Sequence, residues 1–288
     1  MTRIGLIADT HVPERCRSLP SSLTRIFAGV DLILHAGDVG RVEVLRTLEY
    51  IAPVLAVRGN DEPVETLQAL PACRLLERDG RRILLIHGDN SDPAVESRLR
   101  REDRWAAKLE YWADRGRREH ADLVVYGHTH VPTTILHRGV LLVNPGALGS
   151  GSFFHRQSLR TVAIMELLPD QPPSVRHVDV DNPERSPLPQ TDEDRWFSDS
   201  VARFHQAMYD RAVIDNAAWI RDELYPAAPG QVLRWLHALA EQCWFEGREH
   251  VSTHEFVDCL LQDESSRDPL RALILRNEEI AAALDPRC

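Results

Sequence analysis

Seven residues that could bind a metal ion follow apolar segments of this 288-residue chain: Asp9, His11, Asp38, Asn60, His87, His128 and His130. The H-T-H pair at 128–130 stands out, because alternation in extended backbone would send both imidazoles to the same side. An isolated H-x-H is more often a solvent-exposed turn without a role. The other five residues also follow segments typical of buried strands, and this shared position favours a metal-binding role for the histidine pair.

All seven side chains offer oxygen or nitrogen atoms, and none offers a thiolate. Seven ligands are too many for one tetrahedral zinc ion with an open position. They suit two ions ~3.5–4 Å apart that share a carboxylate and a water. Imidazole, carboxylate and amide ligands together favour manganese, iron or zinc over magnesium or copper(I). We therefore expect a dinuclear centre of two divalent ions, manganese first, with iron or zinc as alternatives.

The elements that must position these residues alternate between strands and helices. This alternation predicts an α/β domain with antiparallel additions near its end. Ligands bind beyond the carboxyl ends of strands in such sheets, so the seven residues should meet in one cleft. The predicted helices are 20–30, 43–51 and one long charged helix at 92–119, and the predicted strands are 3–9, 31–38, 53–60, 81–89, 121–130, 140–148, 161–168 and, at an edge, 174–181.

The sequence pattern changes near residue 182. The segment 181–194 is polar and contains three prolines, which is typical of a linker. Beyond it apolar residues recur at helical spacing, one run extending from Phe197 to Met208, and Ser252 and Glu255 predict a capping box. We expect a first domain at 1–182, a linker at 183–190 and an all-helical C-terminal extension at 191–288 that carries no catalytic constellation.

Composition limits the classes of partner. The net charge of −10 argues against an extended surface that wraps nucleic acid by neutralising its phosphates. The five cysteines are scattered, which argues against a disulfide framework or a cysteine zinc site. No stretch reaches the ~18 apolar residues of a membrane span, and a strand-like segment from Arg3 leaves no room for a signal peptide. We expect a cytoplasmic protein without a membrane partner.

The ordered motifs A-D-T-H, H-A-G-D, V-R-G-N-D, I-H-G-D and Y-G-H-T-H resemble those of the calcineurin-like metallophosphoesterases. Their spacing is most similar to the small bacterial and archaeal phosphodiesterase branch, as is N-P-G-A at 144–147, so the resemblance covers residues 1 to about 180. It implies a four-layer α/β/β/α sandwich, to which the helical extension is added. It also implies that one ion binds Asp9, His11, Asp38 and His130, and the other Asp38, Asn60, His87 and His128.

The resemblance further implies that a water or hydroxide bridging the ions attacks the phosphate, which Asn60 and His87 also contact. One residue departs from the family pattern. Much of the family has a histidine at position 61 that stabilises the transition state or protonates the leaving group, whereas this chain has Asp61. A carboxylate there would repel the phosphate unless it is protonated or turned aside. Asp61 is therefore a candidate catalytic residue on the leaving-group side.

The expected function is hydrolysis of phosphodiesters by a metal-dependent phosphoesterase. Two alternatives remain open. A phosphomonoesterase or nucleotidase would share the centre and differ in its pocket, and a non-catalytic protein-binding scaffold would resemble a retromer subunit of similar fold. The complete set of seven ligands favours an enzyme. Eight tryptophan and phenylalanine residues after position 195 predict that the extension packs on the first domain or on a second copy, as a homo-oligomer.

Overall fold

The computed structural model describes residues 1–152, 154–187, 189 and 192–284. Parts of the predicted linker (183–190) and of the predicted extension (191–288) therefore lie outside the described residues. The chain forms two compact units, Met1–Gly151 with Gln157–His205, and Ser152–Arg156 with Gln206–Cys288. The predicted domain boundaries at 182 and 191 stay a prediction. The first compact unit extends further along the chain, to His205, and the second continues from Gln206.

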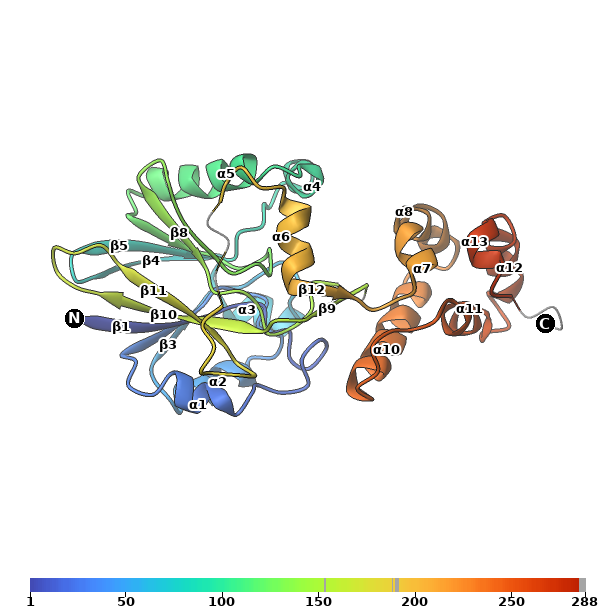
Figure 1. Cartoon of the computed structure of the whole chain (residues 1–288), viewed down its shortest axis with the longest axis horizontal. Helices are drawn as coiled ribbons and strands as arrows, with labels where there is room; N and C mark the ends of the chain where they lie inside the picture. Colours follow the sequence, from blue (N-terminus) through green and yellow to red (C-terminus); the bar gives the residue numbers. More distant parts are fainter. Residues whose placement is uncertain (153, 188, 190–191, 285–288) are drawn as a thin grey trace. The chain divides into compact units, whose positions relative to one another are not determined.

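Two five-stranded mixed sheets form the centre of the first unit (Figure 1). One has the strand order β11 (Ser174–Asp179), β10 (Thr161–Leu167), β1 (Thr2–Ile7), β2 (Leu32–His35) and β3 (Val54–Ala56). The other has the order β4 (Cys73–Arg78), β5 (Arg81–Ile86), β6 (Leu123–Val125), β8 (Val140–Asn144) and β7 (Thr133–His137). Strands β1, β2 and β3 are parallel, as are β5, β6 and β8. The predicted edge strand, β11, does lie at an edge.

Helices cover the outer faces of both sheets, and the alternation of buried side chains along each strand assigns the layers. Ile7 of β1 packs in the cluster that contains α1 (Ser22–Ile26) and α2 (Glu43–Glu49), while Leu6 packs between the sheets. Leu85 of β5 also packs between the sheets, while Leu84 packs in the cluster with α5 (Trp105–Arg118). The four-layer α/β/β/α sandwich is therefore confirmed. The unit also contains the helices α3 (Val64–Ala69), α4 (Pro93–Arg101) and α6 (Phe197–Phe204).

The single helix predicted at 92–119 is wrong, because the structure breaks it in two. Helix α4 (Pro93–Arg101) begins at an Asp92 cap, whose Oδ1 accepts from Ala94 N. The chain is then extended at Arg104, whose backbone N–H donates to Glu102 Oε1 at 2.9 Å. Such a local bond to a side chain competes with the helical ladder. The run from Phe197 to Met208 is also interrupted, since α6 ends at Phe204.

The second unit is mainly helical. Its elements are α7 (Arg211–Asp215), α8 (Ala217–Trp219), the π-helix η1 (Ile220–Leu224), α9 (Tyr225–Ala227), α10 (Gln231–Phe245), α11 (Thr253–Leu261), α12 (Arg267–Ile274) and α13 (Glu278–Ala281). The predicted capping box is confirmed, since Ser252 and Glu255 cap α11 reciprocally. The predicted extension is not all-helical, because β12 (His205–Ala207) pairs with β9 (His155–Gln157) in a two-stranded sheet.

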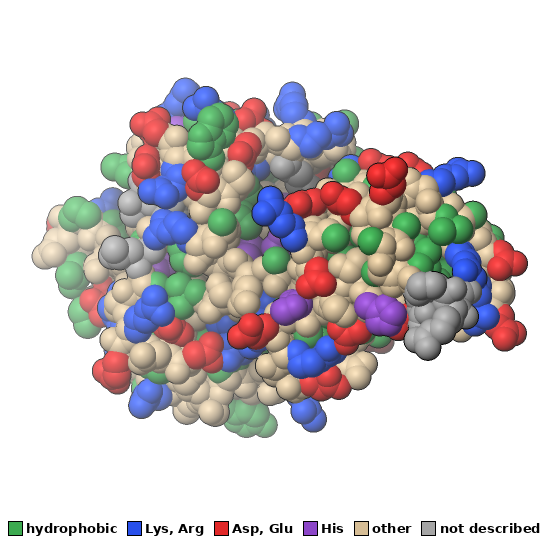
Figure 2. All heavy atoms as spheres, turned by 45° about the vertical axis from the view of Figure 1, so that its right-hand side comes forward, with side chains coloured by type: hydrophobic (Ala, Val, Ile, Leu, Met, Phe, Trp, Pro, Cys, Tyr) green, Lys and Arg blue, Asp and Glu red, His purple; other side chains and the backbone are tan. Residues whose placement is uncertain are grey.

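On the face drawn in Figure 2, basic and acidic side chains alternate, and the coloured residues form no continuous basic patch.

No helix in the described part of the chain is both long enough and apolar enough to cross a membrane.

Candidate metal centre

The loops that follow β1, β2, β3, β5 and β6 carry all seven predicted ligands. Within each sheet these strands are parallel neighbours, so their carboxyl ends point to the same edge. Backbone hydrogen bonds tie the loops together: Asp9 N donates to Gly37 O at 3.0 Å, and Gly127 N donates to His87 O at 2.9 Å. Segments far apart in the sequence are thereby held at one place.

Five of the predicted ligands have left-handed backbone, namely Asp9 (φ 50°), His11 (45°), Asp38 (52°), His128 (67°) and His130 (57°). A positive φ is uncommon for residues other than glycine and costs roughly 1–2 kcal/mol each. Strain of this kind persists where surrounding structure enforces it, as at binding and catalytic sites. It also cancels the alternation expected for H-T-H, because neither histidine lies in extended backbone.

One cluster of ligand atoms comes from Asp9, His11 and His130, which are all buried and lie within 4.8 Å of one another. His130 Nε2 is 3.3 Å from Asp9 Oδ1, and the rings of His11 and His130 stack with centroids 5.4 Å apart. His11 Nε2 is buried and has no hydrogen-bond partner among the described residues. A buried nitrogen left in this way is available to an ion.

A second cluster combines Asp9, Asp38 and His87, again within 4.8 Å of one another. Asp38 Oδ2 is 3.3 Å from His87 Nε2 and 3.4 Å from His11 Nε2, so this oxygen adjoins both clusters. Asn60 Oδ1 is 3.1 Å from His87 Nε2. The structure thus gathers six of the predicted ligands around two adjoining points, with Asp9 common to both clusters and Asp38 between them.

Hydrogen bonds on the far side of two imidazoles orient them. His87 Nδ1 is 2.9 Å from Ala36 O, and His130 Nδ1 is 3.0 Å from Gly149 O. A carbonyl oxygen only accepts, so each Nδ1 carries the proton and each Nε2 can present its lone pair to the centre. This tautomer is the one a metal ligand needs.

Burial and the charges of neighbouring side chains shift the pKa values of the clustered residues strongly. For Asp38, burial raises the pKa, but the neighbouring His87 and His11 outweigh it, so the pKa is lowered. For His87, burial lowers the pKa, but Asp38 and Asp9 outweigh it and raise the pKa to about 10. For His11, burial dominates and lowers the pKa to about 3. Two buried carboxylates thus demand a positive counter-charge, which a bound cation would also provide.

His128 departs from the expected set. Its Nε2 lies 2.9 Å from Glu96 Oε1 on α4, while Glu96 Oε2 accepts from Asn90 N at 2.9 Å. Its backbone N–H donates to both oxygens of Asp9, at 3.1 and 3.0 Å. The His128 ring packs edge-on against His87, with centroids 5.1 Å apart, but belongs to neither cluster. Its role as a metal ligand stays a prediction.

Asp61 pairs with a cation from another loop. Arg15 forms an ion pair with its carboxylate and also donates to Ser150 O at 3.1 Å and Gly151 O at 3.2 Å. Asp61 Oδ2 is 4.0 Å from His11 Nδ1, and its side chain is 49% exposed. The carboxylate is therefore beside the centre, open to solvent and paired with a cation, which offsets part of the expected repulsion of a phosphate.

Glu62 fastens the loops that carry Asp38 and Asn60. Its carboxylate accepts backbone hydrogen bonds from Val39 and Gly40, both at 2.9 Å, and from Gly59 at 3.2 Å. Burial nevertheless raises its pKa to about 7. Three donors to two oxygens suit the ionised carboxylate, which we regard as the form that holds the loops.

Sequence reasoning did not find Arg15, Glu62 or Glu96 as parts of the site. Glu62 had one available signal, its position directly after the G-N-D motif. Arg15 and Glu96 had none, because each reaches the site from a loop or helix whose placement depends on the fold.

The donor set fits divalent metal ions. Separations of 3.3 to 3.4 Å between imidazole nitrogens and carboxylate oxygens suit pairs of ligands with ~2.0–2.2 Å bonds to one ion. The orphaned His11 Nε2 and the oriented imidazoles agree with this. Six candidate ligand residues without a thiolate agree with a site for a divalent metal ion.

Comparison with known proteins identifies the class. Residues 2–169 match the calcineurin-like phosphoesterase superfamily domain, and this is more than half of the chain, which therefore belongs to that family. The chain is 38% identical over 144 residues to a probable metallophosphoesterase of Methanocaldococcus jannaschii, covering 50% of this chain and 67% of the relative. It is 35% identical over 144 residues to a probable metallophosphoesterase of Methanothermobacter thermautotrophicus, covering 50% and 76%.

Solved structures of similar fold include Vps29 from Entamoeba histolytica complexed with zinc (22% identity, TM-score 0.46, covering 62% of this chain and 99% of that one). Another is described as a novel archaeal phosphodiesterase (22% identity, TM-score 0.42, covering 62% and 99%). At these identities the likeness concerns the fold alone. Family membership and the two clusters together make this a metallophosphoesterase-family protein with candidate divalent-metal ligands.

Proposed function

We propose that this protein hydrolyses phosphodiesters at a centre of two divalent metal ions, with manganese favoured and iron or zinc as alternatives. The observation that carries the proposal is the position of Asp38 Oδ2, 3.4 Å from His11 Nε2 and 3.3 Å from His87 Nε2. One carboxylate oxygen between two ligand clusters is what a pair of ions sharing a bridging ligand requires.

In this proposal Asp9, His11 and His130 hold one ion, Asn60, His87 and the predicted ligand His128 hold the other, and Asp38 is shared. Bound ions would activate an attacking water and neutralise charge on the phosphoryl oxygens. The chain's own residues orient the substrate. Asn60 directs its Oδ1 toward His87, which leaves its amide N–H groups free to donate to a phosphate oxygen.

The pair of Asp61 and Arg15 favours diesters over monoesters. A monoester carries about −1.5 to −2 charges at pH 7, like a phosphorylated side chain, whereas a diester carries one. Asp61 repels the dianion more strongly, and Arg15 offsets only part of that repulsion. Asp61 stands where much of the family has a proton-donating histidine, so esters whose leaving groups need no proton should react fastest.

Metal analysis combined with an ester panel tests the proposal. The full chain should hold about two equivalents of manganese, iron or zinc, and Asp38→Ala should disturb both ions because a shared ligand is lost. Asp258→Asn, on the surface of α11, is the matched control. Unchanged metal content in Asp38→Ala would exclude the shared site. A protein that retains both ions but cleaves only monoesters, or no ester, would exclude the diesterase and favour one of the alternatives.

A further inference from the structure

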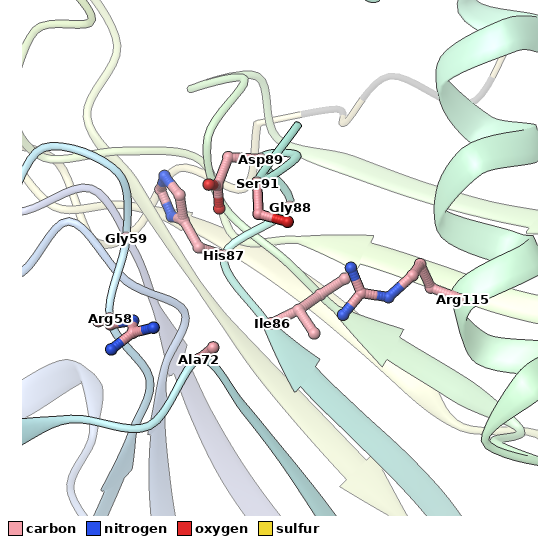
Figure 3. A pocket seen from close by; sticks show the side chains of 9 residues that line it. All are labelled: Arg58, Gly59, Ala72, Ile86, His87, Gly88, Asp89, Ser91 and Arg115. Atoms are coloured by element: carbon pink, nitrogen blue, oxygen red, sulfur yellow. The ribbon is translucent and has the colours of Figure 1, made fainter. Parts of the chain in front are cut away.

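A cavity of about 180 Å³ adjoins the metal centre in the first unit (Figure 3). His87, a proposed metal ligand, lines it, and so does Gly59, which directly precedes Asn60. The cavity therefore adjoins the place where the scissile phosphate would bind in the proposed function. On other sides it is lined by two arginines, Arg58 from the loop after β3 and Arg115 from α5.

Neither arginine is neutralised. Among the described residues, no carboxylate oxygen lies within 4.0 Å of the Arg58 or Arg115 guanidinium. Arg58 Nη1 donates to Leu67 O at 3.3 Å, and Arg115 Nη1 donates to Tyr111 Oη at 3.3 Å. Figure 3 shows both guanidinium groups directed toward the space between them. Asp89 is the one acidic side chain among the lining residues, so the lining arginines and Asp89 sum to one positive charge.

We propose that this cavity binds a second anionic group, a phosphate or a carboxylate, carried by one ester substituent of the substrate. The inference rests on the proposed phosphodiesterase function and specifies its substrate class. A volume of about 180 Å³ is below the ~300–1,000 Å³ of sites that enclose a whole ligand. It suits one substituent, while the scissile phosphate stays at the metal centre.

The chemistry of the walls agrees with such a group. Arginine presents a planar fork of donors that matches the oxygens of carboxylate and phosphate in pairs, and Ser91 adds a hydroxyl. Ile86 and Ala72 form an apolar wall along which a short carbon chain between the two anionic groups can pack. The substrate class is therefore a phosphodiester with a short, acid-terminated arm.

Three nitrophenyl diesters test this inference in the metal-loaded full chain: the ethyl, 2-carboxyethyl and 2-phosphoethyl esters of nitrophenyl phosphate. Arg58→Gln and Arg115→Gln should lower kcat/KM for an anionic ester by about ten- to hundredfold and leave the ethyl ester within about twofold. Arg118→Gln is the matched control, because Arg118 lies exposed on the same helix as Arg115 and does not line the cavity. The preferred anionic ester identifies the terminal group. Metal content of each variant is measured in parallel, because Arg58 is close to Asn60.

The outcomes separate this inference from the proposed function. Cleavage of the ethyl ester without a preference for the anionic esters, or a preference unaltered in both variants, would overturn the inference and leave the diesterase intact. If no diester is cleaved, the proposed function fails. Calorimetric titration of the wild type and the three variants with inorganic phosphate then tests whether the cavity binds an anionic group. Weaker phosphate binding in Arg58→Gln and Arg115→Gln, but not in Arg118→Gln, would support it, and equal binding in all four proteins would overturn it.

Discussion

Replacing Gly59 by alanine should damage the metal centre without altering any ligand. A Cβ built at Gly59 would lie 2.5 Å from Asp38 N and 2.7 Å from Asp38 Cγ, and closer still to Asp38 Oδ1. Real Cβ atoms do not approach heavy atoms below 3.0 Å, so a neighbour must move. Gly59 does not have a left-handed φ, so the backbone itself would accept alanine. The effect therefore isolates the clash with Asp38.

The structure sets the size of this effect. The Asp38 carbonyl accepts from His11 N at 3.0 Å, so the clash with Asp38 N strains the backbone of both loops, and the clash with Asp38 Oδ1 and Cγ makes the side chain rotate. Rotation breaks the 2.9 Å bond from Asp61 N to Asp38 Oδ1 and removes Oδ2 from between His11 and His87. Overpacking costs ~1–3 kcal/mol and a hydrogen bond to a charged group ~1.5–3 kcal/mol, so the total is ~2.5–6 kcal/mol. If half of that total falls on metal affinity, Kd rises about ten- to hundredfold.

Titration of chelator-treated protein with Mn²⁺, followed by metal analysis and thermal unfolding, measures both parts. Gly151→Ala is the matched control. Its new Cβ would lie 3.5 Å from the His130 ring, an ordinary contact, although it too adjoins a proposed ligand. A folded Gly59→Ala protein that binds Mn²⁺ as tightly as the wild type would refute the assignment of Asp38 to the centre.

Three further predictions address the chemistry, the core and the pH dependence. Asp61→His should narrow the difference in kcat/KM between nitrophenyl and alkyl diesters, because a histidine can protonate a poor leaving group near neutral pH. Phe204→Ala should lower the free energy of unfolding in urea by about 3–5 kcal/mol, since Phe204 is 2% exposed. Phe245→Ala, at a 45% exposed position, should cost less than about 1 kcal/mol. Burial holds the pKa of His177, which contacts Thr134, at about 4, below the ~6.5 of an unfolded chain. Its contribution to stability is therefore full above pH ~6.5 and is lost toward pH 4, by up to ~3 kcal/mol, and His177→Asn should reduce that slope in urea titrations across this range.

Each of these has a result that contradicts it. An unaltered leaving-group dependence in Asp61→His would show that position 61 lies outside the chemistry. Equal destabilisation by Phe204→Ala and Phe245→Ala would remove α6 from the core of the first unit. An identical loss of stability on acidification in the wild type and in His177→Asn would mean that other groups set the acid limit.

The convergence of the ligands could be predicted from the sequence to a large extent. Apolar segments ending in Asp9, Asp38 and Asn60 read as neighbouring parallel strands, and the carboxyl ends of such strands meet. The orientation of the two histidines could not be predicted by the alternation rule. Left-handed backbone at positions 128 and 130 turns His130 toward Asp9 and His128 toward Glu96. Tertiary contacts impose that conformation, and the spacing of apolar and polar residues in the sequence does not reveal it.

Helix boundaries failed for a similar reason. The apolar spacing between 92 and 119 continues across the break, but Glu102 bonds the backbone N–H of Arg104 and ends one helix before the next begins. The run from Phe197 also keeps its spacing to Met208, yet Phe204 packs in the core of the first unit and the next residues form β12. The periodic spacing of apolar residues predicts which side chains are buried, but it does not predict in which hydrophobic cluster they pack.

Two of the residues that should decide the substrate, Arg15 and Arg115, are long cations from outside the metal motifs. Asp61 in the G-N-D motif suggests a negative charge that repels the phosphate. Arg15, from the loop after β1, forms an ion pair with Asp61 and reduces that repulsion. Arg115 reaches the cavity from a helix between the I-H-G-D and Y-G-H-T-H motifs. Motif residues must keep their positions for the ions to bind, so they can vary little when the substrate changes. Arginines that approach from other elements can vary without disturbing the ions. The catalytic class therefore follows from the motifs, whereas the proposed acidic arm of the substrate has to be inferred from the cations that line the cavity.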